Sequence, residues 1–284
     1  MAGFEDACRA EDREWYAPMR VGVLCSHRAP GLRHLLHEDP NRGALYDIVC
    51  CLTSEDSFAE GSVAAANGIP VMAHPIHRFC GARDYRLSDL TGRAAYDAAM
   101  VERLAIYRLD LLVLTSYLYV VTEPMLSFFR HRIINVHHSD LIQRDKAGRA
   151  RLTGLRAVRD AIFAGERETR ATVHLVTKEL DEGPPFLRSW ALPVSPLAHD
   201  ALAWNAEDVL KAYSYAHQEW MIRSTWGPLL ASALELIATG RLDLTAVARA
   251  APNVLARPWD LDASGAILGE GPVPAVSPLL AEAP

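Results

Sequence analysis

Lysine is scarce in this sequence, and arginine carries almost all of its positive charge. Lysine occurs only at positions 146, 178 and 211 among 29 lysine and arginine residues. The formal net charge is −6, whereas proteins that bind nucleic acids usually carry a basic surplus. The charge balance therefore argues against a nucleic-acid partner.

The five cysteines are an odd number, and they form neither a CxxC pair nor a Cys/His pattern of metal-ligand spacing. Cys50 and Cys51 are adjacent within a strand-like run, so we interpret them as packed thiols and not as a redox pair. No Asn-x-Ser/Thr sequon occurs, and the N-terminus is too charged for a signal peptide. We therefore expect a reduced, cytoplasmic protein without a metal site.

Long apolar runs and several well-known enzyme motifs are also missing. The most apolar stretch, residues 109–121, contains Asp110 and is shorter than the roughly 20 residues that span a bilayer. Walker A, GxGxxG, GxSxG and HExxH patterns are absent. The sequence therefore gives no support for a membrane protein, a nucleotide hydrolase, a dehydrogenase, an esterase or a zinc protease.

From residue 20 onward, short apolar runs alternate with segments of helical periodicity. Strands are expected at residues 20–26, 46–52, 69–73, 111–115 and 133–137, with a hairpin formed by 172–176 and 186–194. Helices are expected at residues 57–67, 93–107, 124–129, 154–164 and 208–239, with a helical stripe at 32–36. This order predicts an α/β fold, namely an open, mostly parallel twisted sheet with helices on both faces, followed by a C-terminal hairpin and a long helix.

No linker divides the chain into two domains. Residues 1–19 are polar and are predicted to form an N-terminal arm, and residues 20–249 to form one domain. Residues 74–88 show no periodicity and are expected to be irregular. Residues 250–284 are rich in proline, alanine and glycine, which predicts an extended C-terminal tail.

Three polar side chains are expected near the sheet edge where ligands bind in such folds, beyond the carboxyl ends of the strands. Asn135 and His137 are two residues apart on one strand, so they project from the same face. Asp181 lies on the corner that ends at Gly183-Pro184. A lone histidine at a strand end is usually structural. An amide, an imidazole and a carboxylate together, however, suit the transfer of a small acyl group to an amine.

The runs IINVHHSDL, TGLRAVRDAIFAGE and TVHLVTKELDEGP resemble the folate-dependent formyltransferases, over roughly residues 20–244. The resemblance implies a Rossmann-like formyltransferase fold and transfer of a formyl group from 10-formyltetrahydrofolate to a small-molecule amine, without a metal. It implies that Asn135, His137 and Asp181 are the catalytic set. Asn135 and a protonated His137 would stabilise the oxyanion, and Asp181 would raise the pKa of His137. His138 stands where the family more often has proline, and we interpret it as a surface histidine.

The resemblance also implies a folate pocket and an amine pocket. The folate pocket comprises Tyr117, Leu118, Tyr119, Val120, Val121, Thr177, Leu180 and Gly183. The amine substrate is assigned to Ser26, Arg28, Gly31 and Glu219. The family holds a substrate phosphate with an amide-rich loop, and this chain has His27, Arg28 and Pro30 there instead. We expect an anionic amine that depends on Arg28, with Arg78, Arg83 and Arg86 covering the same pocket.

Several alternatives stay open at this level. Glycinamide ribonucleotide, an intermediate of purine biosynthesis, is the first candidate acceptor, and another anionic amine such as an amino sugar or a biosynthetic amine is the second. The same three residues would serve a hydrolase that releases formate from 10-formyltetrahydrofolate. A non-catalytic folate-binding relative is disfavoured because all three residues are present. The sequence leaves open whether the chain forms a homodimer.

Overall fold

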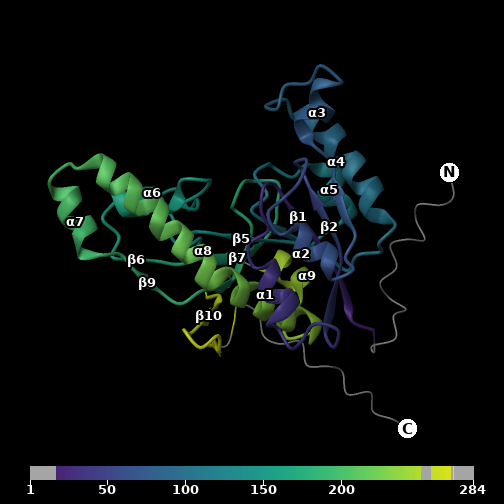
Figure 1. Ribbon diagram of the computed structural model, residues 1–284. Helices are drawn as coiled ribbons and strands as arrows, with labels where there is room; N and C mark the ends of the chain where they lie inside the picture. The colour runs from purple at the N-terminus through teal and green to yellow at the C-terminus, as the bar shows by residue number, and fades with distance from the viewer. Residues whose placement is uncertain (1–16, 251–256, 270, 272–284) are drawn as a thin grey trace, which may run out of the picture.

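The computed structural model describes residues 17–250, 257–269 and 271, and a nine-stranded sheet lies at its centre (Figure 1). In spatial order the strands are β11 (Ile267–Leu268), β10 (Trp259–Leu261), β8 (Pro185–Arg188), β7 (Thr172–Leu175), β5 (Ile133–His137), β4 (Leu111–Thr115), β1 (Met19–Cys25), β2 (Tyr46–Thr53) and β3 (Val71–Ala73). A separate pair is formed by β6 (Glu168–Thr169) and β9 (Leu192–Pro193).

The sheet is mixed but mostly parallel, as the sequence predicts. Strands β3, β2, β1, β4 and β5 run parallel to one another. Strand β7 is antiparallel to both β5 and β8, which confirms the predicted hairpin. The carboxyl ends of β1, β4 and β5 therefore meet at one edge, next to the start of β7.

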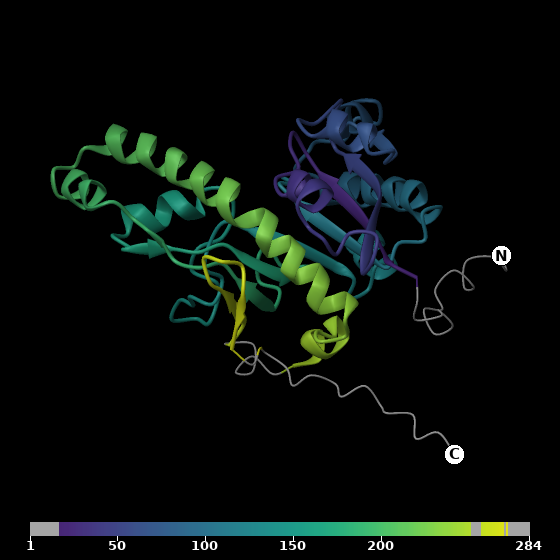
Figure 2. The same ribbon diagram turned by 60° about the horizontal axis from the view of Figure 1, so that its bottom comes forward.

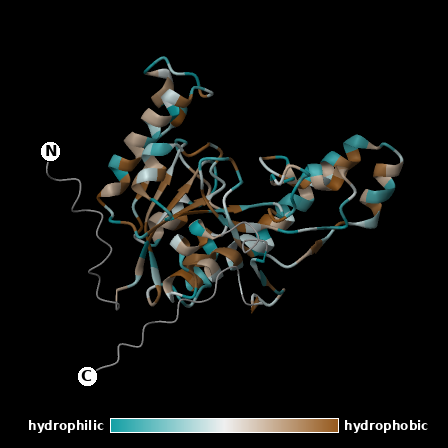
Figure 3. Ribbon diagram, turned by 180° about the vertical axis from the view of Figure 1, so that it is seen from behind, coloured by the Kyte–Doolittle hydropathy of each residue, from teal (hydrophilic) through white to brown (hydrophobic). Residues whose placement is uncertain are grey.

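Helices cover both faces of the sheet, and the strand residues divide between two apolar cores. One core contains side chains from α1 (Leu32–His37), α2 (Gly61–Ala66), α6 (Ala157–Phe163), α7 (Pro196–Ala203), α8 (Glu207–Ala238) and α9 (Leu244–Arg249). The other contains side chains from α3 (Ile76–Gly81), α4 (Leu90–Ala105) and α5 (Glu123–Phe128). Strand β1 shows the division, because Val21, Val23 and Cys25 enter the first core and Leu24 the second. The strands at the centre are accordingly hydrophobic over most of their length (Figure 3).

The long helix α8 brings distant parts of the chain together. Its first turns lie with α7 in an arm that projects from the sheet, and its C-terminal half packs against α1 (Figures 1 and 2). At Gly31, where φ is +88°, a Cβ atom would lie 2.9 Å from a methyl of Leu230 and 3.2 Å from the carbonyl oxygen of Trp226. This close approach places Trp226 beside the loop that follows β1.

The structure corrects three expectations about irregular segments. The stretch at 74–88 contains α3, whose single turn and a half is too short to show periodicity. The expected tail instead adds β10 and β11 to the sheet, with β10 parallel to β8. Helices α7 and α9 also lie where none was expected. Residues 1–16 of the expected N-terminal arm lie outside the described part of the chain.

The cysteines in the described ranges are buried free thiols, as expected for Cys50 and Cys51. Burial raises the pKa of each of these two thiols to about 12, so both are protonated and unreactive at neutral pH. Cys8 lies outside the described residues. No helix in the part of the chain that the structure describes is long and apolar enough to cross a membrane.

Candidate active site

A cavity of about 390 Å³ opens beyond the carboxyl ends of β1, β4 and β5. Its size is that of a small-molecule site. The three predicted catalytic residues, Asn135, His137 and Asp181, all line it. Within the described ranges, no group of three or more His, Cys, Asp or Glu side chains is arranged to hold a metal ion.

Asn135 is oriented by a histidine that we did not predict from the sequence. His174 lies directly opposite Asn135 in the antiparallel β5–β7 pair, and the Asn135 amide Nδ2 is 3.0 Å from the His174 Nε2. The His174 Nδ1 lies 3.1 Å from the carbonyl oxygen of Leu175 and donates to it. Nε2 is therefore the acceptor, and Asn135 uses one N–H on His174 while the second is free to donate into the cavity.

Gly183 holds this arrangement from behind and does not line the cavity. A Cβ atom at Gly183 would lie 1.7 Å from the Leu175 carbonyl oxygen and 3.3 Å from the His174 Nδ1. Only glycine allows the chain to pass so close to the atoms that orient His174. Gly183 was expected to contact folate directly. It instead makes a close backbone contact with Leu175 beneath the site.

Asp181 lies between two histidines on a strained turn. Its φ is +55°, a conformation that side-chain-bearing residues adopt rarely, and the carboxylate accepts a hydrogen bond of 2.7 Å from the Gly154 N–H. Its two oxygens lie 3.6 Å from the His137 Nε2 and 3.9 Å from the His174 Nε2. The carboxylate thus faces both imidazoles across gaps that a small movement or one water molecule would bridge.

Burial of His137 favours the neutral form of its ring over the protonated form that the resemblance implies. Burial, followed by the nearby His174, lowers the pKa of His137 to about 3, because the imidazolium form would lose its hydration. The side chain is only 7% exposed, and its Nε2 has no hydrogen-bond partner. The environment of His137 therefore favours a neutral imidazole whose Nε2 has no hydrogen-bond partner.

His138 is not a surface residue, which corrects the second expectation about this segment. It lines the cavity with 6% of its surface exposed, and its ring centroid lies 4.6 Å from that of His137. Burial, followed by His137, lowers the pKa of His138 to about 3. The ring also lies parallel to Trp226 of α8, at 6.5 Å. Docking of α8 onto the sheet edge covers this histidine.

The predicted folate residues other than Gly183 all line the cavity, and its mouth is apolar. Leu118, Val120, Leu155 and Leu180 line the cavity and keep between 39% and 62% of their surface exposed. Exposed apolar side chains gathered around a cavity mark a ligand site and are unusual elsewhere on a soluble domain. This rim suits a planar, largely apolar ring.

Two buried charged residues of α4 hold the 117–122 loop, and neither was predicted. Arg93 donates a 2.7 Å hydrogen bond to the Val120 carbonyl oxygen and lies 4.6 Å from the centre of the Tyr119 ring. Asp97 accepts hydrogen bonds of 2.6 Å and 2.7 Å from the N–H and hydroxyl of Thr122. Both residues are at most 3% exposed, so this loop is attached to the helix by charged contacts.

Replacement of Arg93 by methionine is expected to weaken binding of a folate analogue about tenfold, because a charged hydrogen bond worth about 1.5–3 kcal/mol is lost from the loop. Calorimetric titration of the variant measures this. Arg103→Met changes an exposed arginine of the same helix and is the matched control. Equal affinity of the Arg93 variant and the wild type would contradict a positioning role for Arg93.

The four predicted amine-site residues lie close together, but only Arg28 lines the cavity. The Ser26 side chain is fully buried, where its hydroxyl lies 2.8 Å from that of Ser54 and accepts from the Leu118 N–H. Gly31 packs against α8. Glu219 is paired with Arg28, at 2.7 Å between the Arg28 Nη2 and the Glu219 Oε1. The positive charge of Arg28, which was expected to attract an anionic substrate, is therefore already compensated by Glu219.

The arginines expected to cover the same pocket lie elsewhere. Arg78 and Arg83 line a separate recess beside α3 and α4, and Arg78 is paired with Asp56 at 2.8 Å. Arg86 lines neither cavity. The stretch 74–88 was expected to be irregular, and it instead contains α3, which carries Arg78.

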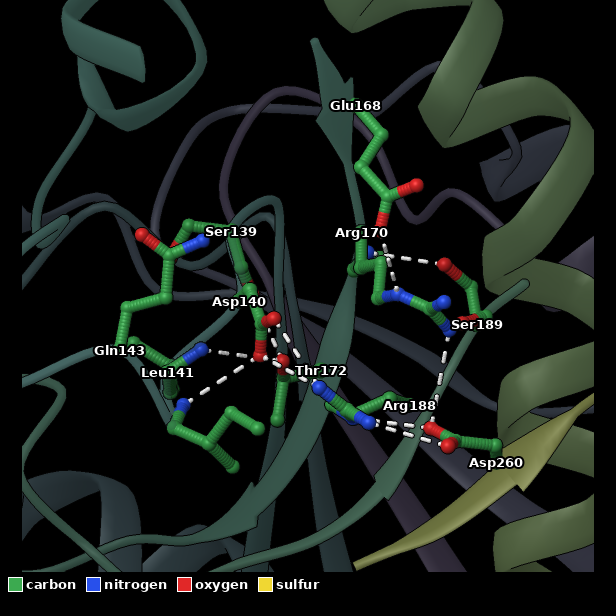
Figure 4. A network of polar contacts seen from close by, with 12 residues as sticks. Ser139, Asp140, Leu141, Gln143, Glu168, Arg170, Thr172, Arg188, Ser189 and Asp260 are labelled. Atoms are coloured by element: carbon green, nitrogen blue, oxygen red, sulfur yellow. Dashed lines mark hydrogen bonds and ion pairs between the residues drawn. The ribbon is translucent and has the colours of Figure 1, made fainter. Parts of the chain in front are cut away.

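The segment after β5 is fixed by a polar network (Figure 4). The Arg188 guanidinium donates to both oxygens of Asp140, at 3.0 and 3.2 Å, and to both oxygens of Asp260 on β10, at 2.8 and 3.0 Å. The Thr172 hydroxyl donates to the Ser139 carbonyl oxygen at 2.7 Å. The residues that directly follow His138 are thus held by β7, β8 and β10.

The parallel sheet edge and its amide, imidazole and carboxylate groups define an α/β group-transfer site. Residues 19–223 match the family described as formyl transferase, and the chain belongs to this family, whose members use formyltetrahydrofolate. The predicted family and fold are thereby confirmed, as is the prediction of a formyltransferase enzyme.

Named relatives and solved structures agree with this assignment. The chain is 30% identical over 178 residues to the phosphoribosylglycinamide formyltransferase of Mycobacterium tuberculosis, covering 63% of this chain and 73% of the relative. It is 28% identical over 181 residues to the trifunctional purine biosynthetic protein adenosine-3 of Drosophila melanogaster, covering 62% of this chain and only 12% of the relative. Glycinamide ribonucleotide transformylase 1 from Symbiobacterium toebii has a similar structure, with a TM-score of 0.57, 28% identity, and coverage of 80% and 90% of the two chains.

Proposed function

We propose that the protein transfers a formyl group from 10-formyltetrahydrofolate to an amine. The observation that carries the proposal is the convergence of Asn135, His137 and Asp181 in one cavity with an apolar rim. The folate is proposed to lie against the 117–121 loop and residues 177–180, where it would supply the formyl group. Family membership supports the folate, and the exposed leucines of the rim support a planar ring there.

Each catalytic side chain has a role that its environment supports. Asn135 keeps one N–H free for the oxygen on which negative charge develops when the amine attacks the formyl carbon. His137 is neutral, so its free ring nitrogen can take the proton that the attacking amine loses. Asp181 faces that ring and stabilises the imidazolium that forms. The imidazolium then returns this proton to the folate nitrogen as the bond between that nitrogen and the formyl carbon breaks. The residues thus divide oxyanion stabilisation and proton transfer between them.

The identity of the amine is a finer question. The relatives make glycinamide ribonucleotide the first acceptor to assay, and its turnover would place the chain in purine biosynthesis. Another amine would keep the same chemistry and change the pathway. Water as acceptor would release formate, and the neutral imidazoles of His137 and His138 would equally accept a proton from water.

Leu118→Asp is expected to abolish most formyl transfer by weakening folate binding, because it places an unpaired charge on the apolar rim. The measurement is folate absorbance during reaction with a panel of amines, with formate determined separately to detect hydrolysis. Leu197→Asp, at an exposed leucine on α7, is the matched control. Unchanged affinity of the Leu118 variant for a folate analogue would remove the 117–121 loop from the folate site.

A further inference from the structure

Three positions of the loop after β1, residues 26–31, have no backbone N–H group left for a ligand. The Ser26 N–H donates to the Ser116 carbonyl oxygen at 3.2 Å. The Ala29 N–H donates to the Glu60 carboxylate at 2.6 Å. Pro30 has no N–H to donate. A loop that holds a phosphate presents several free N–H groups together, and residues 29 and 30 of this loop offer none.

The anion that this loop binds through the Ala29 N–H is a side chain of the protein itself, the carboxylate of Glu60. It lies at the start of α2, and the neighbouring Ala59 N–H donates to the His27 carbonyl oxygen at 2.9 Å, which ties the two segments together. The Glu60 carboxylate therefore stays at the Ala29 N–H. A phosphate brought to the same loop would meet this negative charge in place of an open N–H group.

The arginine of the loop is likewise engaged. Arg28 and Glu219 form a two-point contact, with Nη1 at 2.9 Å from one carboxylate oxygen and Nη2 at 2.7 Å from the other. The hydrogen bond from Arg28 lowers the pKa of Glu219, which keeps the carboxylate ionised. The positive charge of Arg28 at this end of the cavity is thus matched by the carboxylate of Glu219.

Two uncharged polar atoms of cavity-lining residues have no hydrogen-bond partner, whereas the Arg28 guanidinium is paired with Glu219. The His138 ring bonds the Leu155 backbone through one nitrogen, so Nε2 carries a lone pair and has no partner. The Trp226 Nε1–H also has no partner. Both residues line the cavity and are at most 6% exposed. A buried acceptor and a buried donor without partners each cost free energy until a ligand satisfies them.

We propose that the acceptor is an amine without a phosphate group, held through uncharged polar contacts. Its amino N–H donates to the His138 Nε2, and a hydroxyl or carbonyl oxygen of the same molecule accepts from the Trp226 Nε1–H. The Arg28–Glu219 pair closes this end of the cavity as a neutral wall. The inference rests on the proposed formyl transfer and specifies the substrate class of that site.

The test compares amines that differ only in a phosphate, namely glycinamide ribonucleotide against its ribonucleoside and glucosamine 6-phosphate against glucosamine. The phosphate-free member of a pair is expected to have a kcat/KM about tenfold higher or more, which corresponds to about 1.4 kcal/mol. A preference of the wild type for the phosphorylated member would overturn the proposal.

Variants of Glu60 test whether its carboxylate causes the preference for the phosphate-free amine. Glu60→Gln removes the charge, and Glu60→Ala also frees the Ala29 N–H, so the two are expected to raise kcat/KM for the phosphorylated amine stepwise. The phosphate-free partner is expected to keep its value in both. Glu123→Gln removes the same charge from the far helix α5 and is the control. An identical response to all three variants would reject the role of Glu60.

A binding measurement gives a result even without turnover. Inorganic phosphate, titrated into the protein saturated with a folate analogue, is expected to bind the wild type no more tightly than Arg28→Ala. Tight binding that is lost in Arg28→Ala would show a phosphate site and refute the proposal. Absence of both folate binding and formyl transfer would instead refute the proposed function, so the two failures are distinguishable.

Discussion

Asn135→Ala is expected to lower kcat by about 100-fold to 1000-fold, the usual effect of removing one oxyanion donor. The Asn135 amide has one N–H engaged by His174 and one directed to no other group, so the substrate oxygen loses its donor in the variant. The affinity for a folate analogue is expected to stay near the wild-type value. Steady-state kinetics together with calorimetry would separate the two effects.

Ser116→Ala is a control for this substitution, because Ser116 lines the same cavity at the end of the neighbouring strand β4. It is expected to leave kcat nearly unchanged. A kcat above one tenth of the wild-type value in Asn135→Ala would mean that another group stabilises the charge, since that ratio is only about 1.4 kcal/mol.

The free energy of unfolding is expected to fall steeply as the pH drops below 6.5. His137 and His138 each have a folded-state pKa of about 3, against about 6.5 in an unfolded chain. Between these values the unfolded chain binds protons that the folded protein does not, so acid favours unfolding. Each histidine then contributes about 1.4 kcal/mol per pH unit, and this stability is present above pH 6.5.

Urea unfolding curves at a series of pH values measure this slope, and His138→Gln isolates the contribution of one histidine. The variant is expected to lose about 1.4 kcal/mol per pH unit of the slope between pH 6 and 4. Above pH 7 its stability is expected to run parallel to that of the wild type. An unchanged slope would show that the His138 ring gains protons as easily when folded as when unfolded.

The parts of the fold that follow from local chemistry were predictable. Strand β4 begins and ends where its apolar run does, because it is buried on both faces and leaves no polar alternation to obscure it. Strand β5 also coincides with its predicted range, 133–137. Helix α8 was predicted to within one residue at each end, because its length makes the periodicity clear and Gly240 ends it. The placement of Asn135 at a strand end followed from the same pattern.

The features that depend on pairing between distant segments were not predictable. His174 meets Asn135 only through the register of an antiparallel pair, although a polar residue within the apolar run 172–176 was a usable signal. His138 is buried because α8 brings Trp226 over it, and a single strand pattern carries no information about that contact. The low pKa of His137 likewise follows from burial, which outweighs an acidic neighbour that the sequence does show.

The contact of Arg188 with both Asp140 and Asp260 has a consequence for how the enzyme is made. Translation delivers Asp140 and Arg188 long before Asp260, so the nascent chain holds the segment after His138 by one carboxylate instead of two. The second carboxylate arrives only with β10, after every cavity-lining residue has already been synthesised. Full support of this segment therefore waits for the synthesis of β10, and a ribosome that stalls before β10 leaves a chain with all of its cavity-lining side chains and an unfinished support.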